Sequence, residues 1–186
     1  MQTFELKDHL SHAWTNELVS FPLEVSAKVG RLRVRDDKGR LIPSQISAGP
    51  GNRRRVHFIV DELAPLGRRS YTLEETSDPM PAIANPPACS MDGNTTLLGN
   101  GLITVRAPTS SSAVAQFPAP VLAVRRGQGP WIGEGRLMLS DFLKPKSVEC
   151  TLLEQGPLWL TSQLRYICER GDRYTEQFRV YADRPF

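Results

Sequence analysis

The sequence predicts an all-β protein, with a small N-terminal β-barrel followed by an antiparallel β-sandwich segment that we expect to be incomplete. Short runs in which apolar and polar residues alternate recur along the chain, and this is the side-chain period of a β-strand. The 14 glycines and 15 prolines lie mostly between these runs, as in proteins with many turns. No segment has the sustained apolar spacing of three and four residues that predicts an amphipathic helix.

The first part of the chain, residues 1–76, is predicted to form the barrel. Pro22 lies inside the first predicted strand and indicates an edge position or a bulge. Asp36 to Gly39 is typical of a hairpin turn, and the Gly-Pro-Gly-Asn segment from Gly49 is a second turn. The strands are predicted at residues 17–25, 30–35, 40–48, 55–61 and 69–74.

Residues 77–93 are predicted to be a linker between this module and a second one at residues 94–186. The segment contains Asp-Pro-Met-Pro from Asp78 and Asn-Pro-Pro from Asn85, and such proline-rich chain is extended and stiff. Beyond it we expect strands at residues 102–107, 121–126, 136–139 and 148–154, and then a long closing hairpin.

The closing hairpin has arms at residues 158–169 and 173–183, joined by a turn at Gly171 and Asp172. Apolar residues alternate along both arms, as expected for strands that cover a core. The sequence continues only to Phe186, so nothing remains to pair with the outer arm. A long, half-apolar edge strand is a poor natural edge, and we therefore interpret the chain as the front part of a larger β-rich protein.

Composition indicates the kind of protein and the compartment in which we expect it. Hydrophobic residues make up 40% of the chain and charged residues 23%, which is typical of a globular protein. No apolar stretch is long enough to span a bilayer, and the charged N-terminus does not resemble a secretory signal. Cys89, Cys150 and Cys168 are widely spaced and odd in number, so we expect reduced thiols rather than disulfides or a zinc site, and a cytoplasmic location.

The residues alone identify no catalytic group, metal ligand or cofactor. No phosphate-binding glycine loop and no Gly-x-Ser-x-Gly turn is present. The histidines, His9, His12 and His57, form no metal-binding motif, and the glutamates are scattered without a spacing that selects an acid and base pair. We therefore do not expect this chain alone to be an enzyme.

An uneven distribution of charge is more informative. Residues 31–69 carry ten Lys or Arg and four acidic residues, whereas the remainder of the chain is net acidic. Arg31, Arg33 and Arg35 occupy alternate positions of one predicted strand, so their side chains share a face. With Arg53 to Arg55 they could form a patch that binds carboxylates, for example those of an acidic polysaccharide. The alternative is a solvated edge strand whose charges discourage aggregation; nucleic acid is disfavoured because no aromatic residues interleave.

Trp131 is the second candidate binding residue. It lies between glycines in Gly-Pro-Trp-Ile-Gly, and an indole in such a loop can stack on a sugar ring. Packing in the core is the alternative for Trp131, and it is the expectation for Trp159 in the closing hairpin.

Two groups of segments resemble a known family. Residues 17–23, 36–45, 56–61 and 65–73 are similar to a small β-barrel module at the start of exo-rhamnogalacturonan-lyase-like proteins. A motif comparable to Pro-Leu-Gly-x-x-x-Tyr, which begins at Pro65, also occurs in β-domains of family 38 α-mannosidases. Residues 98–105, residues 154–158 and the final hairpin look like the opening of the large β-sandwich that follows in such enzymes. The order of the two modules resembles the lyase-like arrangement more closely.

This resemblance implies carbohydrate chemistry for a longer protein, whose parent resembles a polysaccharide lyase or a glycoside hydrolase. The leading hypothesis is a non-catalytic N-terminal region that helps to shape a glycan groove. Alternatives are a free-standing carbohydrate-binding module and a β-sheet interaction or assembly domain. The expected partners are an acidic polysaccharide or oligosaccharide and a downstream catalytic domain or partner sheet, with no nucleic acid and no membrane.

Overall fold

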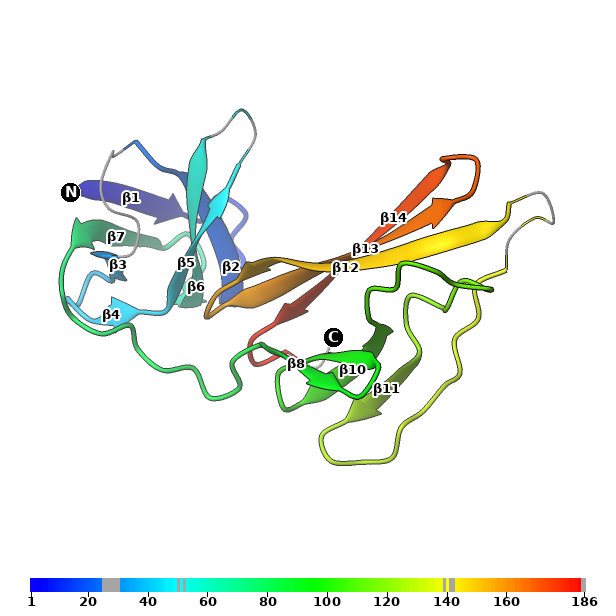
Figure 1. Cartoon of the computed structure of the whole chain (residues 1–186). Helices are drawn as coiled ribbons and strands as arrows, with labels where there is room; N and C mark the ends of the chain where they lie inside the picture. Colours follow the sequence, from blue (N-terminus) through cyan, green and yellow to red (C-terminus); the bar gives the residue numbers. More distant parts are fainter. Residues whose placement is uncertain (25–30, 50, 52, 139, 141–142, 185–186) are drawn as a thin grey trace. The chain divides into compact units, whose positions relative to one another are not determined.

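The fold is described by a computed structural model that covers residues 1–24, 31–49, 51, 53–138, 140 and 143–184 (Figure 1). Over these residues the protein is all-β, as the sequence predicts. The described residues form no α-helix, and so include none with the length and apolar character needed to cross a membrane. The chain divides into two compact units, Met1–Ala82 and Ile83–Phe186, which are described separately.

The first unit consists of two antiparallel sheets. One has the strand order β1-β7-β3-β4 and the other the order β2-β6-β5. The chain passes from the first sheet to the second at Pro43, which separates β4 from β5. The strands are β1 (Gln2–Lys7), β2 (Trp14–Pro22), β3 (Leu32–Arg35), β4 (Leu41–Ile42), β5 (Ser44–Ala48), β6 (Arg54–Leu63) and β7 (Arg68–Glu75).

The prediction of a barrel is wrong in one respect: no closed barrel forms among the described residues. No strand ladder joins the two sheets, and β1, β4, β2 and β5 remain sheet edges there. Between β1 and β2 the side chain of Gln2 replaces ladder bonds, since its Nε2 donates to the Pro22 carbonyl and its Oε1 accepts from the Glu24 amide. Pro43 has no amide hydrogen to continue a ladder where the chain changes sheet.

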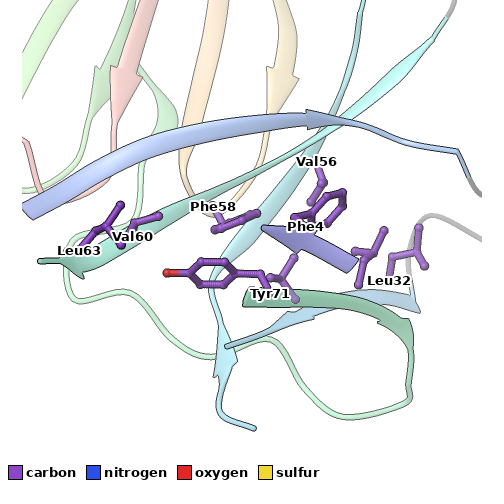
Figure 2. Close-up of a cluster of buried hydrophobic side chains, with 9 residues drawn as sticks. Phe4, Leu32, Val56, Phe58, Val60, Leu63 and Tyr71 are labelled. Carbon is purple, nitrogen blue, oxygen red and sulfur yellow. The ribbon is translucent and has the colours of Figure 1, made fainter. Parts of the chain in front are cut away.

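The two sheets share one core of aliphatic side chains around Phe4, Phe58 and Tyr71 (Figure 2). Alternation along β6 directs Val56, Phe58 and Val60 inward, and all three are at most 2% exposed, as the sequence predicts. The Phe58 ring lies 4.6 Å from that of Tyr71, measured between centroids. Phe4 of β1 stacks on Phe21 of β2, also at 4.6 Å, so side chains hold together two edges that have no ladder.

The second unit also has two antiparallel sheets around a core. Their orders are β11-β10-β9-β8 and β12-β13-β14, consistent with the predicted sandwich segment. The strands are β8 (Ala88–Asp92), β9 (Thr95–Gly99), β10 (Ile103–Pro108), β11 (Ala123–Arg126), β12 (Pro145–Gln155), β13 (Trp159–Cys168) and β14 (Arg173–Tyr181).

Two local predictions for this unit are corrected by the structure. The last part of the predicted linker is strand β8, which pairs with β9. The strand predicted at residues 136–139 is absent at residues 136–138, and residue 139 lies outside the described residues. The turn predicted at residues 49–52 also includes two positions, 50 and 52, that are outside them.

The closing hairpin is present as predicted. Its first arm, β13, is the central strand of its sheet and carries a row of buried side chains, among them Leu160, Leu164 and Tyr166. Trp159 packs, as expected, at 1% exposure, and its Nε1 donates to Glu154. The outer arm, β14, pairs with β13, and its other edge has no ladder among the described residues.

Candidate functional site

Two of the three arginines predicted to form a binding face lie on β3. Leu32 and Val34 are buried, so Arg33 and Arg35 project from the opposite face, whereas Arg31 immediately precedes the strand. Arg35 contacts two carboxylates: its Nε donates to Glu74, and its Nη2 lies 2.7 Å from Asp78 Oδ2. The hydrogen bond to Glu74 is the main reason why the pKa of Arg35 is raised. Its charge is therefore largely matched within the unit.

Arg33 is also used internally. Its Nε donates to the carbonyl of Asp78 at 3.2 Å, and its Nη1 donates to the carbonyl of Leu32. Arg31 is exposed. Arg33 and Arg35 thus both bind Asp78. A role of the three arginines in ligand binding stays a prediction.

Arg54 and Arg55 of the second predicted group belong to the other sheet, and Arg53 immediately precedes their strand. Arg55 lies on β6, where its Nε donates to Ser20 Oγ at 2.6 Å and its Nη2 to the Ser20 carbonyl. Because β3 and β6 lie in different sheets, the strand pairing does not place the two arginine groups side by side.

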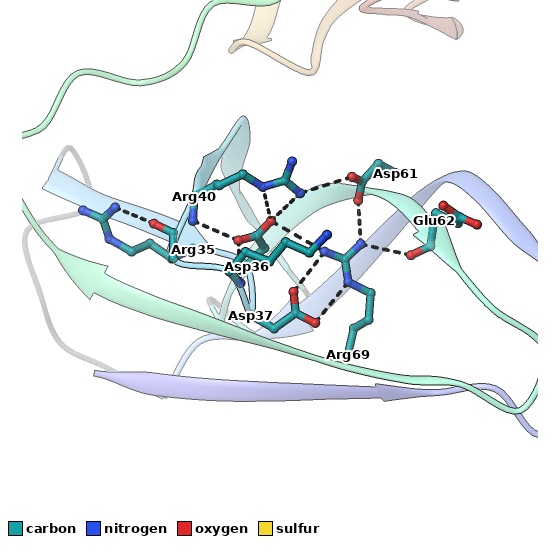
Figure 3. Close-up of polar contacts among 9 residues, drawn as sticks. Arg35, Asp36, Asp37, Arg40, Asp61, Glu62 and Arg69 are labelled. Atoms are coloured by element: carbon teal, nitrogen blue, oxygen red, sulfur yellow. Dashed lines mark hydrogen bonds and ion pairs between the residues drawn. The ribbon is translucent and has the colours of Figure 1, made fainter.

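Two further basic residues of this region, Arg40 and Arg69, are paired in a network around the hairpin turn after β3 (Figure 3). The buried carboxylate of Asp36 accepts from the amides of Lys38 and Arg40 and from the Arg40 side chain. Arg69 pairs with Asp61 at 2.7 Å and with Asp37 at 3.2 Å. Burial opposes ionisation of Asp36, but the hydrogen bonds from Arg40 and Lys38 outweigh it and lower its pKa. This network stabilises the turn and pairs the charges of Arg40 and Arg69 within the unit.

His57 contacts a serine side chain of the neighbouring strand. Ser47 Oγ and His57 Nε2 are 2.7 Å apart. The two residues are diagonal neighbours, since Gln45 pairs with His57 and Ser47 with Arg55 across β5 and β6. A cross-strand hydrogen bond is the ordinary consequence of this placement. No group of three or more His, Cys, Asp or Glu that could hold a metal occurs in the described part of the chain.

An apolar groove of about 400 Å³ lies between β1, β2 and the turn that joins them. Its walls include Leu6, Leu10, Trp14 and Leu18. The carboxylate beside it, Asp8, already accepts hydrogen bonds from three backbone amides and from Trp14 Nε1. Lys7, His9 and Glu17 also line the groove, so it combines apolar surface with polar side chains at its wall.

The structure brings together one cluster that the sequence does not reveal. The guanidinium carbons of Arg106 and Arg125 lie over the ring of Trp131, at 4.1 Å and 4.7 Å from its centroid. Arg106 also pairs with Asp92 at 3.3 Å. All of these residues belong to the second unit. We call Trp131, Arg106 and Arg125 the Trp131 cluster.

Backbone pairing positions this cluster. Arg106 on β10 and Arg125 on β11 occupy the same face, because Thr104 pairs with Arg125 and Arg106 pairs with Ala123. The segment after Trp131 is held against β11 by two hydrogen bonds between the backbones of Val124 and Ile132, at 2.9 Å and 2.8 Å.

Gly135 allows this segment to approach the sheet closely, since a Cβ there would clash with the Val121 carbonyl oxygen. Trp131 itself is half-buried, between the two outcomes predicted for it.

Sequence reasoning selected Trp131 but missed both arginines. Arg106 is 25 positions before Trp131, and only the register of β10 and β11 brings the three residues together. The available signal was an arginine within each of the predicted strands at residues 102–107 and 121–126.

No protein-family model matches the sequence, and no curated protein matches it. Among solved structures, two similar chains are an α-mannosidase from Enterococcus faecalis V583 and a glycosyl hydrolase family 38 protein from Enterococcus faecalis. Each is 14% identical over 88% of this chain, with a TM-score of 0.35.

This chain covers 23% and 24% of the two structures, so it spans about a quarter of their length. At this TM-score the likeness carries no argument about function. Neither structure is a rhamnogalacturonan lyase, and that resemblance stays a prediction.

Proposed function

We propose that this chain is a non-catalytic β-module of a larger carbohydrate-active protein, and that its second unit contacts a glycan through the Trp131 cluster. The observation that carries the proposal is the half-buried indole of Trp131 with the guanidinium groups of Arg106 and Arg125 over its ring. Aromatic and guanidinium groups held together at a surface are the residue types that bind sugars and their acidic substituents. The sequence resemblance to carbohydrate-active proteins points in the same direction.

The arrangement favours binding over turnover. Glycoside hydrolysis requires two carboxyl groups, one on each side of the bond that breaks. In the described part of the second unit, the carboxylate in contact with the cluster is that of Asp92, which pairs with Arg106. A single carboxylate in an ion pair does not supply that chemistry.

Glycan retention tests the proposal directly. In affinity electrophoresis through gels that contain acidic or neutral polysaccharides, we expect the chain to be retarded by at least one polysaccharide. Trp131→Ala should abolish the retardation and keep the circular dichroism spectrum of the parent. A folded parent chain that no polysaccharide retards would contradict the proposal.

The open edge of β14 favours a second candidate function, a β-sheet interaction domain. A strand whose outer amides and carbonyls have no ladder can accept a strand from a partner. Sedimentation velocity of the chain would distinguish the two functions, because self-association that Gln177→Pro on β14 abolishes would support the interaction domain.

A further inference from the structure

Two guanidinium groups lie over the ring of Trp131. The guanidinium carbons of Arg106 and Arg125 lie within 5 Å of the ring centroid, at 4.1 Å and 4.7 Å. The Trp131 ring therefore supports two guanidinium groups, which are the charged part of the cluster.

The charges of the cluster are not balanced. Arg106 has one carboxylate partner, Asp92, at 3.3 Å, and the Asp92 side chain is 58% exposed. Among the described residues, no ion pair is formed by Arg125. The two cations thus have one ion-pair partner between them, Asp92 on Arg106, which leaves a net positive charge in the cluster.

Hydrogen-bonding capacity also remains unused. The Nε atoms of Arg106 and Arg125 are both buried and have no hydrogen-bond acceptor among the described residues. An unpaired buried donor on a charged group is unfavourable, and a nearby anion would reduce that cost. The terminal nitrogens of a guanidinium form a fork that matches the two oxygens of a carboxylate.

The two arginines are positioned before any ligand arrives. As diagonal neighbours on β10 and β11 they have Cα atoms roughly 7–8 Å apart. The backbone bonds between Val124 and Ile132 fix the segment that carries Trp131. A preformed site loses little conformational entropy on binding.

We infer that the Trp131 cluster is a carboxylate-binding subsite for a uronic acid residue of a glycan, and that Asp92 occupies the place of the ligand carboxylate when the site is empty. This inference rests on the proposed glycan-binding function and specifies its ligand class. The ligand carboxylate displaces Asp92 from Arg106 and also pairs with Arg125.

Isothermal titration calorimetry on the whole chain tests the inference with two probes, a trisaccharide of galacturonic acid and the corresponding trisaccharide of galactose. We expect the acidic probe to bind at least roughly tenfold more tightly, because charge-assisted hydrogen bonds contribute that much discrimination. The preference should shrink as salt rises.

Three variants sharpen the test. Arg125→Gln should weaken binding of the acidic probe roughly tenfold. Asp92→Asn should strengthen it a few-fold, because it removes the internal competitor for Arg106, and a gain in affinity does not arise from misfolding. Arg165→Gln is the matched control: this arginine pairs with Glu149 at 3.1 Å on the other sheet of the same unit, and its loss should leave binding unchanged.

The outcomes distinguish failure of the carboxylate subsite from failure of glycan binding as a whole. Equal binding of the acidic and neutral probes would overturn the carboxylate subsite and leave glycan binding in place. Binding of neither probe by a folded chain that also shows no retardation by polysaccharides would overturn both. An Asp92→Asn variant that binds the acidic probe more weakly would show that Asp92 is not a stand-in for the ligand.

Discussion

At the scale of single residues, burial follows the alternation of apolar residues in the sequence. Substitution of a core residue of the first unit therefore tests how much that burial stabilises the fold. Phe58 is fully buried and contacts the rings of Phe4, Phe21 and Tyr71. We expect Phe58→Ala to lower the free energy of unfolding by about 3–5 kcal/mol, from lost burial and the cavity left behind. Urea unfolding followed by tryptophan fluorescence measures this. Leu10→Ala, at a position that is 73% exposed, is the control and should change stability by less than about 0.5 kcal/mol.

The carboxyl of Asp8 makes the free energy of unfolding depend on pH. Its hydrogen bond from Trp14, together with those from three backbone amides, lowers the pKa of the carboxyl far below its ordinary value of 3.8. Because the folded-state pKa is lowered, the stabilisation is fully present well above pH 4 and is lost as the pH falls through the folded-state pKa.

We expect Asp8→Asn to destabilise the chain clearly at pH 7 and by a smaller amount at pH 3, where the folded-state carboxyl is still ionised but that of the unfolded chain is largely protonated, as measured by urea midpoints. Glu5→Gln, which removes an exposed pair with Arg68 at 3.5 Å, should have a small effect at both pH values. A deficit of the Asp8 variant that is equal at the two pH values would contradict this role of the carboxylate.

At the scale of elements, strands with strong alternation could be predicted from the sequence, whereas strands with weak burial could not. β6 and β13 each bury every second side chain over most of their length, and both were predicted. β8 has mostly exposed side chains and directly follows a pair of prolines, so its pairing with β9 leaves little trace in the sequence. The same limit explains the Trp131 cluster, because the register between β10 and β11 is a tertiary property.

The turn of the closing hairpin gives an element-scale prediction. Gly171 has a φ of 91°, a backbone conformation that side chains with a Cβ rarely adopt. Gly171→Ala should therefore destabilise the second unit by about 1–2 kcal/mol. Gly171→Asn is the matched variant and should cost less, since asparagine tolerates positive φ better than alanine. Thermal unfolding followed by circular dichroism compares them, and equal losses would argue against backbone strain as the cause.

At the scale of the whole molecule, each unit has two sheets and its own core. A body of this size with a hydrophobic core of its own can bury enough apolar surface to fold without its neighbour. We expect residues 1–82, produced alone, to unfold cooperatively in urea and to give dispersed amide signals in an NMR spectrum. A non-cooperative transition with collapsed signals would show that the first unit depends on the second.

The passage of the chain at Pro43 has a consequence for how the first unit comes apart. The two-residue strand β4 and the five-residue strand β5 lie on either side of one proline and belong to different sheets. Because one residue links them, unfolding of β4 or β5 also disturbs the other strand, and we expect that neither sheet opens separately at a low free-energy cost. The amides of β6 and β7, which lie inside the two sheets, should then exchange with deuterium at a common rate.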